Sequence, residues 1–262
     1  MTDQPLDVLP IWAVYILTVL IALLMAEGGY RLGRWWHKRT EADKTDKTGV
    51  VSSLVGATLA MLAFLIVFVN GFAAQRFDTR RHLVLEEANA IGTTYLRTGF
   101  LDEPYRTQAR QLLPEYVDSR LAATNPSKFA EERAHSEQIQ NQLWAGAEAA
   151  ARANPSAITA LYEESVNEVI DLHEERVTAA TARVPLTIWV VIYFVAFLSM
   201  LMVGFNNGLL GSRSLFALVV LVLIFSAVIL LVVDLDRPRE GFLQVSQQPL
   251  IDVQNQLRGS LR

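Results

Sequence analysis

The sequence contains no cysteine, which excludes disulfides, iron–sulfur clusters, cysteine-ligated zinc and a thiol nucleophile. It also lacks a glycine-rich phosphate loop, a Gly-x-Ser-x-Gly elbow and a His-Glu-x-x-His pair, so we expect no catalytic residue, no cofactor and no enzyme. The net charge of −4 provides no basic surface, and nucleic acid is not an expected partner. Only 19% of the 262 residues are charged and 52% are apolar, which disfavours a soluble or disordered chain.

The apolar residues are concentrated in four long blocks. They cover residues 9–26, 50–74, 185–204 and 215–233, and none contains lysine or arginine. A helix needs about 20 mostly apolar residues to cross a bilayer. The blocks therefore predict an all-α integral membrane protein with four transmembrane helices and the lipid bilayer as a partner.

The segment between the second and third blocks predicts a helical extramembrane insert. An acidic or amide residue precedes proline at 102–104, 125–127 and 154–156, as at a helix start, and helix-forming residues fill the stretches between. We expect four helices here, the first continuing the second span to about Thr98 and the last running from Pro155 into the third span.

This pattern divides the chain into four parts. Residues 1–74 hold the first two spans and a basic connecting turn, 75–184 form the insert, 185–234 hold the last two spans, and 235–262 form a C-terminal tail. Both termini and the insert then lie on one side of the membrane. The weakly amphipathic segment 249–257 predicts either a surface tail or a helix that docks on the insert or on a neighbouring subunit.

The basic residues give a local prediction of orientation, because lysine and arginine near span ends usually lie in the cytoplasm. Six follow the first span, whereas residues 1–10 contain none (Arg31, Arg34, Lys38, Arg39, Lys44, Lys47). The first span often dominates insertion, which places the insert outside the cytoplasm. A count over both faces ties at seven each, so the rule leaves the other orientation open.

An aromatic stripe marks the second span. Phe64, Phe68 and Phe72 recur every four residues, and Asn70 lies among them. Such rings around a symmetry axis form a hydrophobic constriction that gates by dewetting, so these four residues are pore candidates. The alternative is a stripe that faces lipid or another helix.

Polar residues form two further stripes where the insert meets the spans. The candidates are Arg76, Asp78, Arg80, Arg81, Glu86, Glu87, Asn89 and Thr93 after the second span, and Asn167, Asp171, Glu174 and Arg176 before the third. Facing stripes would either bind a divalent cation or form a buried network of ion pairs. We expect the network and no metal. A di-iron site is disfavoured because Ile170, not glutamate, stands three residues before His173.

Five runs carry a family resemblance. They are residues 76–81, 86–93, 113–118, 171–176 and 234–238, of which Glu-Glu-Ala-Asn-Ala and Leu-Asp-Arg-Pro are the more specific parts. With these runs the chain resembles a bacterial family of four-span membrane proteins that is described as bestrophin-like and has no assigned activity. Bestrophins are pentameric anion channels with a helical cytosolic domain. The resemblance therefore implies an ion-conducting homo-oligomer, with the insert in the cytoplasm, contrary to the local charge pattern.

Two functions follow from these patterns. The first is an ion channel of the bacterial inner (plasma) membrane that conducts inorganic ions, with anions as the candidate ions. The alternative is a non-conducting structural or signalling membrane protein whose insert binds a partner. The second is supported by the lack of ionisable residues inside the spans, where pumps and proton-coupled transporters usually need one.

Overall fold

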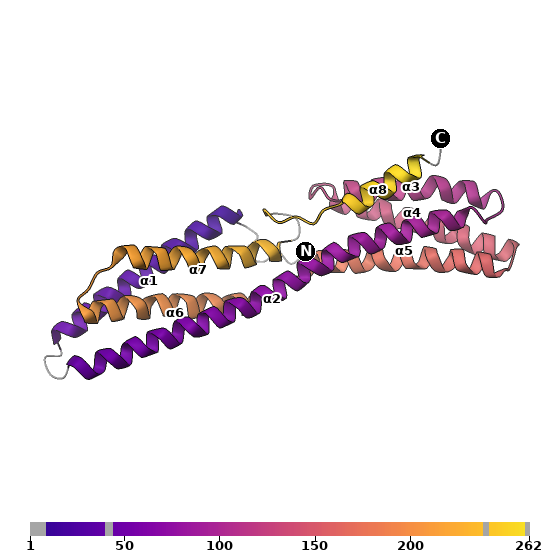
Figure 1. Cartoon of the computed structure of the whole chain (residues 1–262). Helices are drawn as coiled ribbons and strands as arrows, with labels where there is room; N and C mark the ends of the chain where they lie inside the picture. Colours follow the sequence, from indigo (N-terminus) through magenta and orange to yellow (C-terminus); the bar gives the residue numbers. More distant parts are fainter. Residues whose placement is uncertain (1–8, 40–43, 238–240, 260–262) are drawn as a thin grey trace. The chain divides into compact units, whose positions relative to one another are not determined.

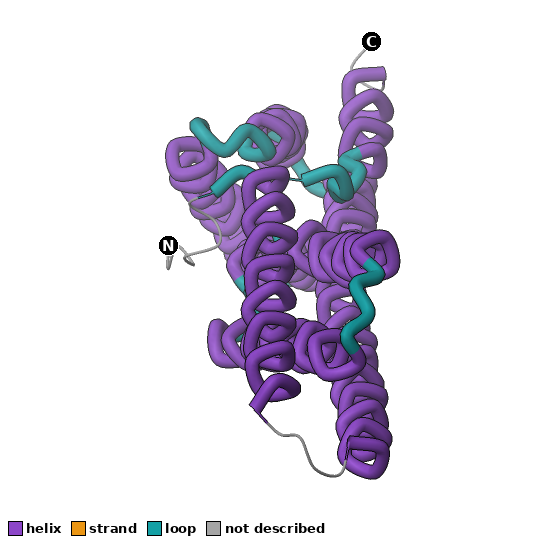
Figure 2. Tube along the Cα trace, turned by 90° about the vertical axis from the view of Figure 1, so that its left-hand side faces the viewer, coloured by secondary structure: helices purple, strands orange, loops and turns teal. Residues whose placement is uncertain are grey.

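The computed structural model of the chain describes residues 9–39, 44–237 and 241–259, in which every regular element is an α-helix (Figure 2). The helices are α1 (Ile11–Arg39), α2 (Lys44–Thr98), α3 (Tyr105–Ala122), α4 (Phe129–Ala153), α5 (Ala157–Thr181), α6 (Leu186–Leu210), α7 (Leu215–Asp236) and α8 (Gln248–Gly259). This confirms the predicted all-α class. The side chains of Lys44 and Lys47, and the whole of Pro238, lie outside the described residues.

The chain divides into two compact units. The first unit comprises residues 1–76 and 183–243 and contains α1, the N-terminal part of α2, α6 and α7. The second unit comprises residues 77–182 and 244–262 and contains the C-terminal part of α2, α3, α4, α5 and α8 (Figure 1). The C-terminal residues from 244 onward therefore belong to the same unit as the insert.

All four apolar blocks of the sequence lie in helices that are long and apolar enough to cross a membrane. The most apolar window of α2 is only 11% buried within the chain, compared with 22–28% for the other three spans. Among the spans, α2 therefore leaves the most apolar surface for lipid or for other protein to cover.

Glycines hold α1 and α6 in close contact. Each of the two helices carries a pair of buried glycines four residues apart. They are Gly29 and Gly33 on α1, and Gly204 and Gly208 on α6. A Cβ atom at Gly29 would overlap the carbonyl of Leu201. Since lipid supplies no hydrophobic drive between spans, such close backbone packing is a main source of helix association.

The predicted continuity from the insert into the third span is wrong. Helix α5 ends at Thr181, and Ala182 has extended backbone angles before α6 begins at Leu186. The cause is Pro185, which lacks an amide hydrogen and disfavours helical angles at the residue before it. At its other end, α6 runs past the third apolar block, which ends at residue 204, and stops before Gly211, whose φ of +66° suits glycine.

The second unit has a continuous apolar core. Its most deeply buried apolar residues come from five helices (Ile91, Leu113, Val117, Ile139, Ala147, Val166, Leu250). A helix begins after each of the three predicted proline starts. At α5, Ser156 and Thr159 form a capping box, and at α3 the Glu103 carboxylate accepts the amide hydrogen of Thr107 at 3.2 Å.

Helix α8 packs into this core rather than lying free on the surface. Leu250, Val253 and Leu257 are buried at spacings of three and four. Gln254 and Arg258 bind the Asp118 carboxylate on α3, the latter at 2.8 Å. Of the predicted alternatives for segment 249–257, the structure shows docking on the insert.

Candidate functional site

The aromatic stripe of α2 lies on the surface of the first unit. Phe64, Phe68 and Phe72 are 69%, 55% and 43% exposed, and their ring centroids follow one another at 6.4 and 4.9 Å. Another face of α2 is buried (Leu62, Ile66, Val69, Ala73). At about 100° per residue, the two faces lie roughly 130° apart around the helix. The three rings, called the Phe stripe below, are therefore free to contact lipid or another chain.

Asn70 lies on the side of α2 away from the Phe stripe, about 160° from it and about 70° from the buried face. Its side-chain oxygen is buried and accepts no hydrogen bond from the described residues. An unsatisfied amide oxygen in an apolar helix is costly, which makes Asn70 a candidate for a contact that the single chain lacks.

The interior of the second unit contains a buried carboxylate, Glu87 on α2. Its Oε1 accepts hydrogen bonds from Arg120 Nε at 2.7 Å and from the Tyr116 hydroxyl at 2.9 Å, both on α3. Its Oε2 binds Arg176 on α5, which also binds Gln247 from the C-terminal segment. One carboxylate thus joins α2, α3, α5 and the segment before α8.

Tyr116 extends this network to α4 and to a second residue of α5. Its hydroxyl oxygen accepts a hydrogen bond from Gln140 Nε2 at 3.3 Å and lies 3.2 Å from His173 Nδ1. Tyr116 and His173 have no exposed side-chain surface. These residues are called the Glu87 cluster below (Glu87, Tyr116, Arg120, Gln140, His173, Arg176).

The charges in this cluster follow from burial and from neighbouring ions. Burial alone would raise the pKa of Glu87, but the positive charges of Arg120 and Arg176 outweigh it and hold that pKa below its ordinary value. Burial, together with Arg120, lowers the pKa of His173 to about 4. At neutral pH the cluster therefore contains a charged Glu87 and a neutral imidazole.

Most of the predicted polar residues lie outside this cluster. Glu87 and Arg176 meet as an ion pair, and Arg80 is buried and donates to the Ala179 carbonyl at 3.2 Å. The others are exposed or half-exposed (Arg76, Asp78, Arg81, Glu86, Asn89, Thr93, Asn167, Asp171, Glu174). Glu86 pairs with His82 on its own helix, and Asn167 with Asp171.

The prediction that the two polar stripes face each other in the interior is therefore wrong. The neighbouring Glu87 takes that place because it falls in line with Val84 and Ile91, at spacings of three and four, on the apolar face of α2. A carboxylate within an apolar stripe is a sequence signal for a buried charged partner. Tyr116, Arg120, Gln140 and His173 were not among the predicted site residues.

A second set of buried polar residues lies at the C-terminal end of α7 in the first unit (Asp234, Asp236, Arg237). The Asp234 carboxylate accepts the amide hydrogens of Phe242 and Leu243 at 2.7 and 3.1 Å, and Asp236 accepts that of Val184 at 2.9 Å. Arg237 donates to the Leu9 carbonyl at 2.7 Å. The Asp-Leu-Asp-Arg run thus ties together three segments that are distant in sequence.

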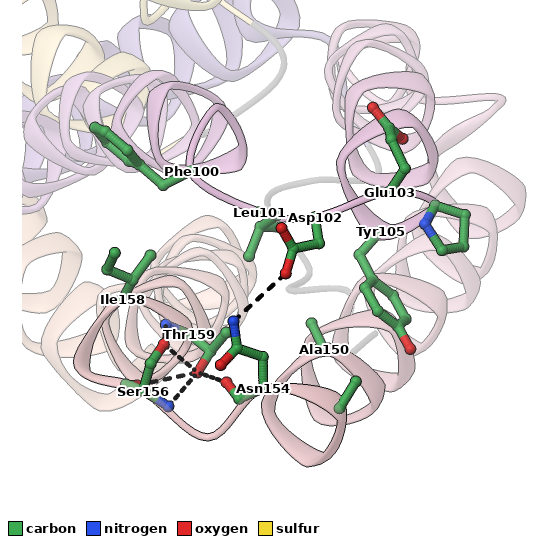
Figure 3. A pocket seen from close by; sticks show the side chains of 12 residues that line it. Phe100, Leu101, Asp102, Glu103, Tyr105, Ala150, Asn154, Ser156, Ile158 and Thr159 are labelled. Atoms are coloured by element: carbon green, nitrogen blue, oxygen red, sulfur yellow. Dashed lines mark hydrogen bonds between the residues drawn. The ribbon is translucent and has the colours of Figure 1, made fainter.

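A cavity of about 330 Å³ opens at one end of the second unit (Figure 3). It lies between the turn after α2 and the turn before α5, where Asn154 donates to Asp102 at 3.4 Å. Asp102 and Glu103, the charged residues of its lining, are exposed to solvent. We therefore assign no ligand to it.

Comparison with known proteins relates most of the chain to one family. The model of the bestrophin-like domain matches residues 13–250. No curated protein sequence matches the chain. A crystal structure of a bacterial bestrophin homologue from Klebsiella pneumoniae, with one substitution, has a TM-score of 0.71 at 13% identity and covers 96% of this chain and 98% of its own.

Other solved structures agree with this fold. A different variant of a bestrophin homologue from the same organism has a TM-score of 0.69 at 14% identity, with coverages of 95% and 98%. A crystal structure described as a membrane protein has a TM-score of 0.64 at 17% identity, with coverages of 96% and 97%. At these identities the likeness establishes the fold. Together with the four apolar helices, the matched family model shows that this multi-pass membrane protein belongs to the bestrophin-like family.

Proposed function

We propose that the protein is one subunit of a homo-oligomeric ion channel of the bacterial inner membrane, with α2 of each copy lining the pore. The observation that carries the proposal is the Phe stripe, which is exposed on the span that the chain itself covers least. Around a symmetry axis, three such rings per copy form successive hydrophobic constrictions.

Family membership supports this role, since bestrophins are channels, and we propose anions as the conducted ions. The four apolar blocks contain no lysine or arginine, so the proposed pore wall is apolar. The energy barrier to a permeating ion is then the cost of removing its hydration water. Asn70 lies about 160° around α2 from the Phe stripe, so we propose that its amide contacts a neighbouring helix or subunit rather than the permeating ion.

The test is ion flux through the purified protein in liposomes. We expect wild-type protein to conduct, with Phe68→Ala faster because a wider and less apolar constriction dewets less readily, and Phe68→Trp slower. Phe194→Ala is the matched control, because Phe194 is exposed to a similar degree on α6 and lies outside the proposed pore.

Two results would contradict the channel. One is no flux of anions or cations above protein-free liposomes across a range of pH, which would favour the alternative of a non-conducting structural or signalling protein. The other is a change of flux in Phe194→Ala equal to that in Phe68→Ala, which would indicate a general effect on the bilayer rather than a pore.

A further inference from the structure

We propose a binding site for a divalent transition metal, of the zinc class, formed by Glu137 on α4 and by His173 and Glu174 on α5. One ligand atom from each residue lies within 4.8 Å of the other two. The site lies wholly inside the second unit and does not depend on the proposed channel function.

The second, independent observation is His173 Nε2. The imidazole is completely buried, and this nitrogen has no hydrogen-bond partner among the described residues. It lies 3.9 Å from Glu174 Oε1, which is too long for a hydrogen bond. A buried nitrogen directed at a carboxylate without a bond to it is the arrangement that an inserted cation satisfies.

The hydrogen bonds of the Glu87 cluster determine which imidazole nitrogen carries the lone pair. Tyr116 has one hydroxyl hydrogen and donates it to Glu87, so its oxygen accepts from His173 Nδ1–H. In the neutral imidazole, Nε2 then keeps its lone pair directed toward the carboxylates. Metal-binding histidines typically donate their other N–H to a fixed partner in this way, which orients the ring.

The donor set selects the class of metal. One imidazole and two carboxylates suit zinc and related transition metals, whereas calcium and magnesium prefer oxygen ligands alone. Ligand atoms around zinc lie roughly 3.3 Å apart, at bond lengths of about 2.0–2.2 Å. Glu137 and Glu174 are half-exposed, so their side chains have room to close around the ion, and water completes the coordination.

Arg133 is the competitor for these carboxylates. Its Nε lies 2.8 Å from Glu137 Oε1, and its NH2 lies 3.9 Å from Glu174 Oε2. Of the two Glu174 oxygens, Oε2 is the one closer to Arg133. The other oxygen of this carboxylate, Oε1, is the one that lies near His173. Arg133 is itself part-exposed and can turn to solvent, so its removal is expected to strengthen metal binding.

The experiment uses the full chain in detergent, purified without a polyhistidine tag and stripped with a chelator. We would titrate zinc, follow the melting temperature, and measure bound metal after dialysis. We expect one zinc per chain and a rise in melting temperature. Glu137→Gln and Glu174→Gln should each weaken binding by about tenfold or more, as loss of metal-site interactions does.

Matched variants separate this site from adventitious binding. Glu175→Gln removes a neighbouring exposed carboxylate and should bind zinc as the wild type does. Arg133→Gln should bind more tightly. The proposal is overturned if the wild type retains no more zinc than the Glu137→Gln, Glu174→Gln double variant, or if calcium and magnesium displace zinc at equal concentration. Flux through liposomes is a separate readout, so failure of either proposal does not affect the other.

Discussion

Glu87 shows how one side chain organises the second unit. Transfer of a carboxylate from water to the interior is costly, and it is tolerated here because two arginines and a tyrosine use both of its oxygens. Glu86, its neighbour in sequence, keeps access to water and, among the described residues, pairs with His82 on its own helix. Adjacent residues of the same chemistry thus have opposite roles because they lie on different faces of α2.

Replacing Glu87 by Gln should destabilise the protein strongly. Arg120 and Arg176 would then stay buried without a counter-charge, a change that typically costs about 3–5 kcal/mol. The control Glu86→Gln changes an exposed pair, for which about 0–1 kcal/mol is typical. Thermal unfolding in detergent measures both. Equal melting temperatures for the two variants would show that the Glu87 cluster does not hold the unit together.

Among the helices, α2 combines two environments in one continuous element. In both of its parts a stripe at spacings of three and four is buried, from Leu62 to Ala73 and again from Val84 to Tyr95. Outside the buried stripe, the first part carries the Phe stripe and the second part carries Glu86, Asn89 and Thr93. The helical spacing of the apolar residues gives both parts of α2 a face that packs against the rest of the chain. The residues on the remaining faces determine whether that part of α2 is suited to lipid or to water.

The contact between α1 and α6 predicts a sharp difference between two adjacent glycines. Gly29→Ala places a methyl group into the backbone of α6 and should lower the melting temperature, as overpacking usually costs about 1–3 kcal/mol. Gly28→Ala faces open space on the same helix and should be neutral or slightly stabilising. A Gly29→Ala variant as stable as Gly28→Ala would contradict this packing of the two helices.

At the scale of the whole molecule, membrane topology is the first property to test. The four-span arrangement predicts that the turn between α6 and α7 and the turn between α3 and α4 lie on opposite sides of the membrane. Ser212 and Asn125 are exposed residues of these turns, and the wild type contains no cysteine that would interfere.

Single cysteines at Ser212 and Asn125 should be labelled by a membrane-impermeant reagent from opposite sides. The basic residues after the first span predict that the thiol at Ser212 is the cytoplasmic one. Labelling of intact cells, before and after permeabilisation, distinguishes the sides. If both thiols react from the same side, the four-span topology is wrong. If only Ser212 reacts in intact cells, the insert is cytoplasmic.

The amino-acid sequence alone was sufficient for the properties that depend on local composition. Four apolar blocks without lysine or arginine predicted the spans, because the thickness of the bilayer sets the length of a crossing helix. Helix-forming residues after the prolines at 104, 126 and 155 predicted the helical insert, because helix propensity is also a local property. The main local error was at Pro185, where the rule for residues before proline was available and argues for the break between α5 and α6.

Tertiary structure decided which polar residues meet. The sequence pattern placed Glu86 and Glu87 together as candidates, but only the packing of α2 against α3 and α5 brings Arg120, Tyr116 and His173 to Glu87. The approach of Gly29 to Leu201 and the docking of α8 beside Asp118 also join residues more than a hundred positions apart. The local sequence pattern determines which face of a helix is apolar. Which helix packs against that face depends on the tertiary arrangement of segments that are distant in sequence.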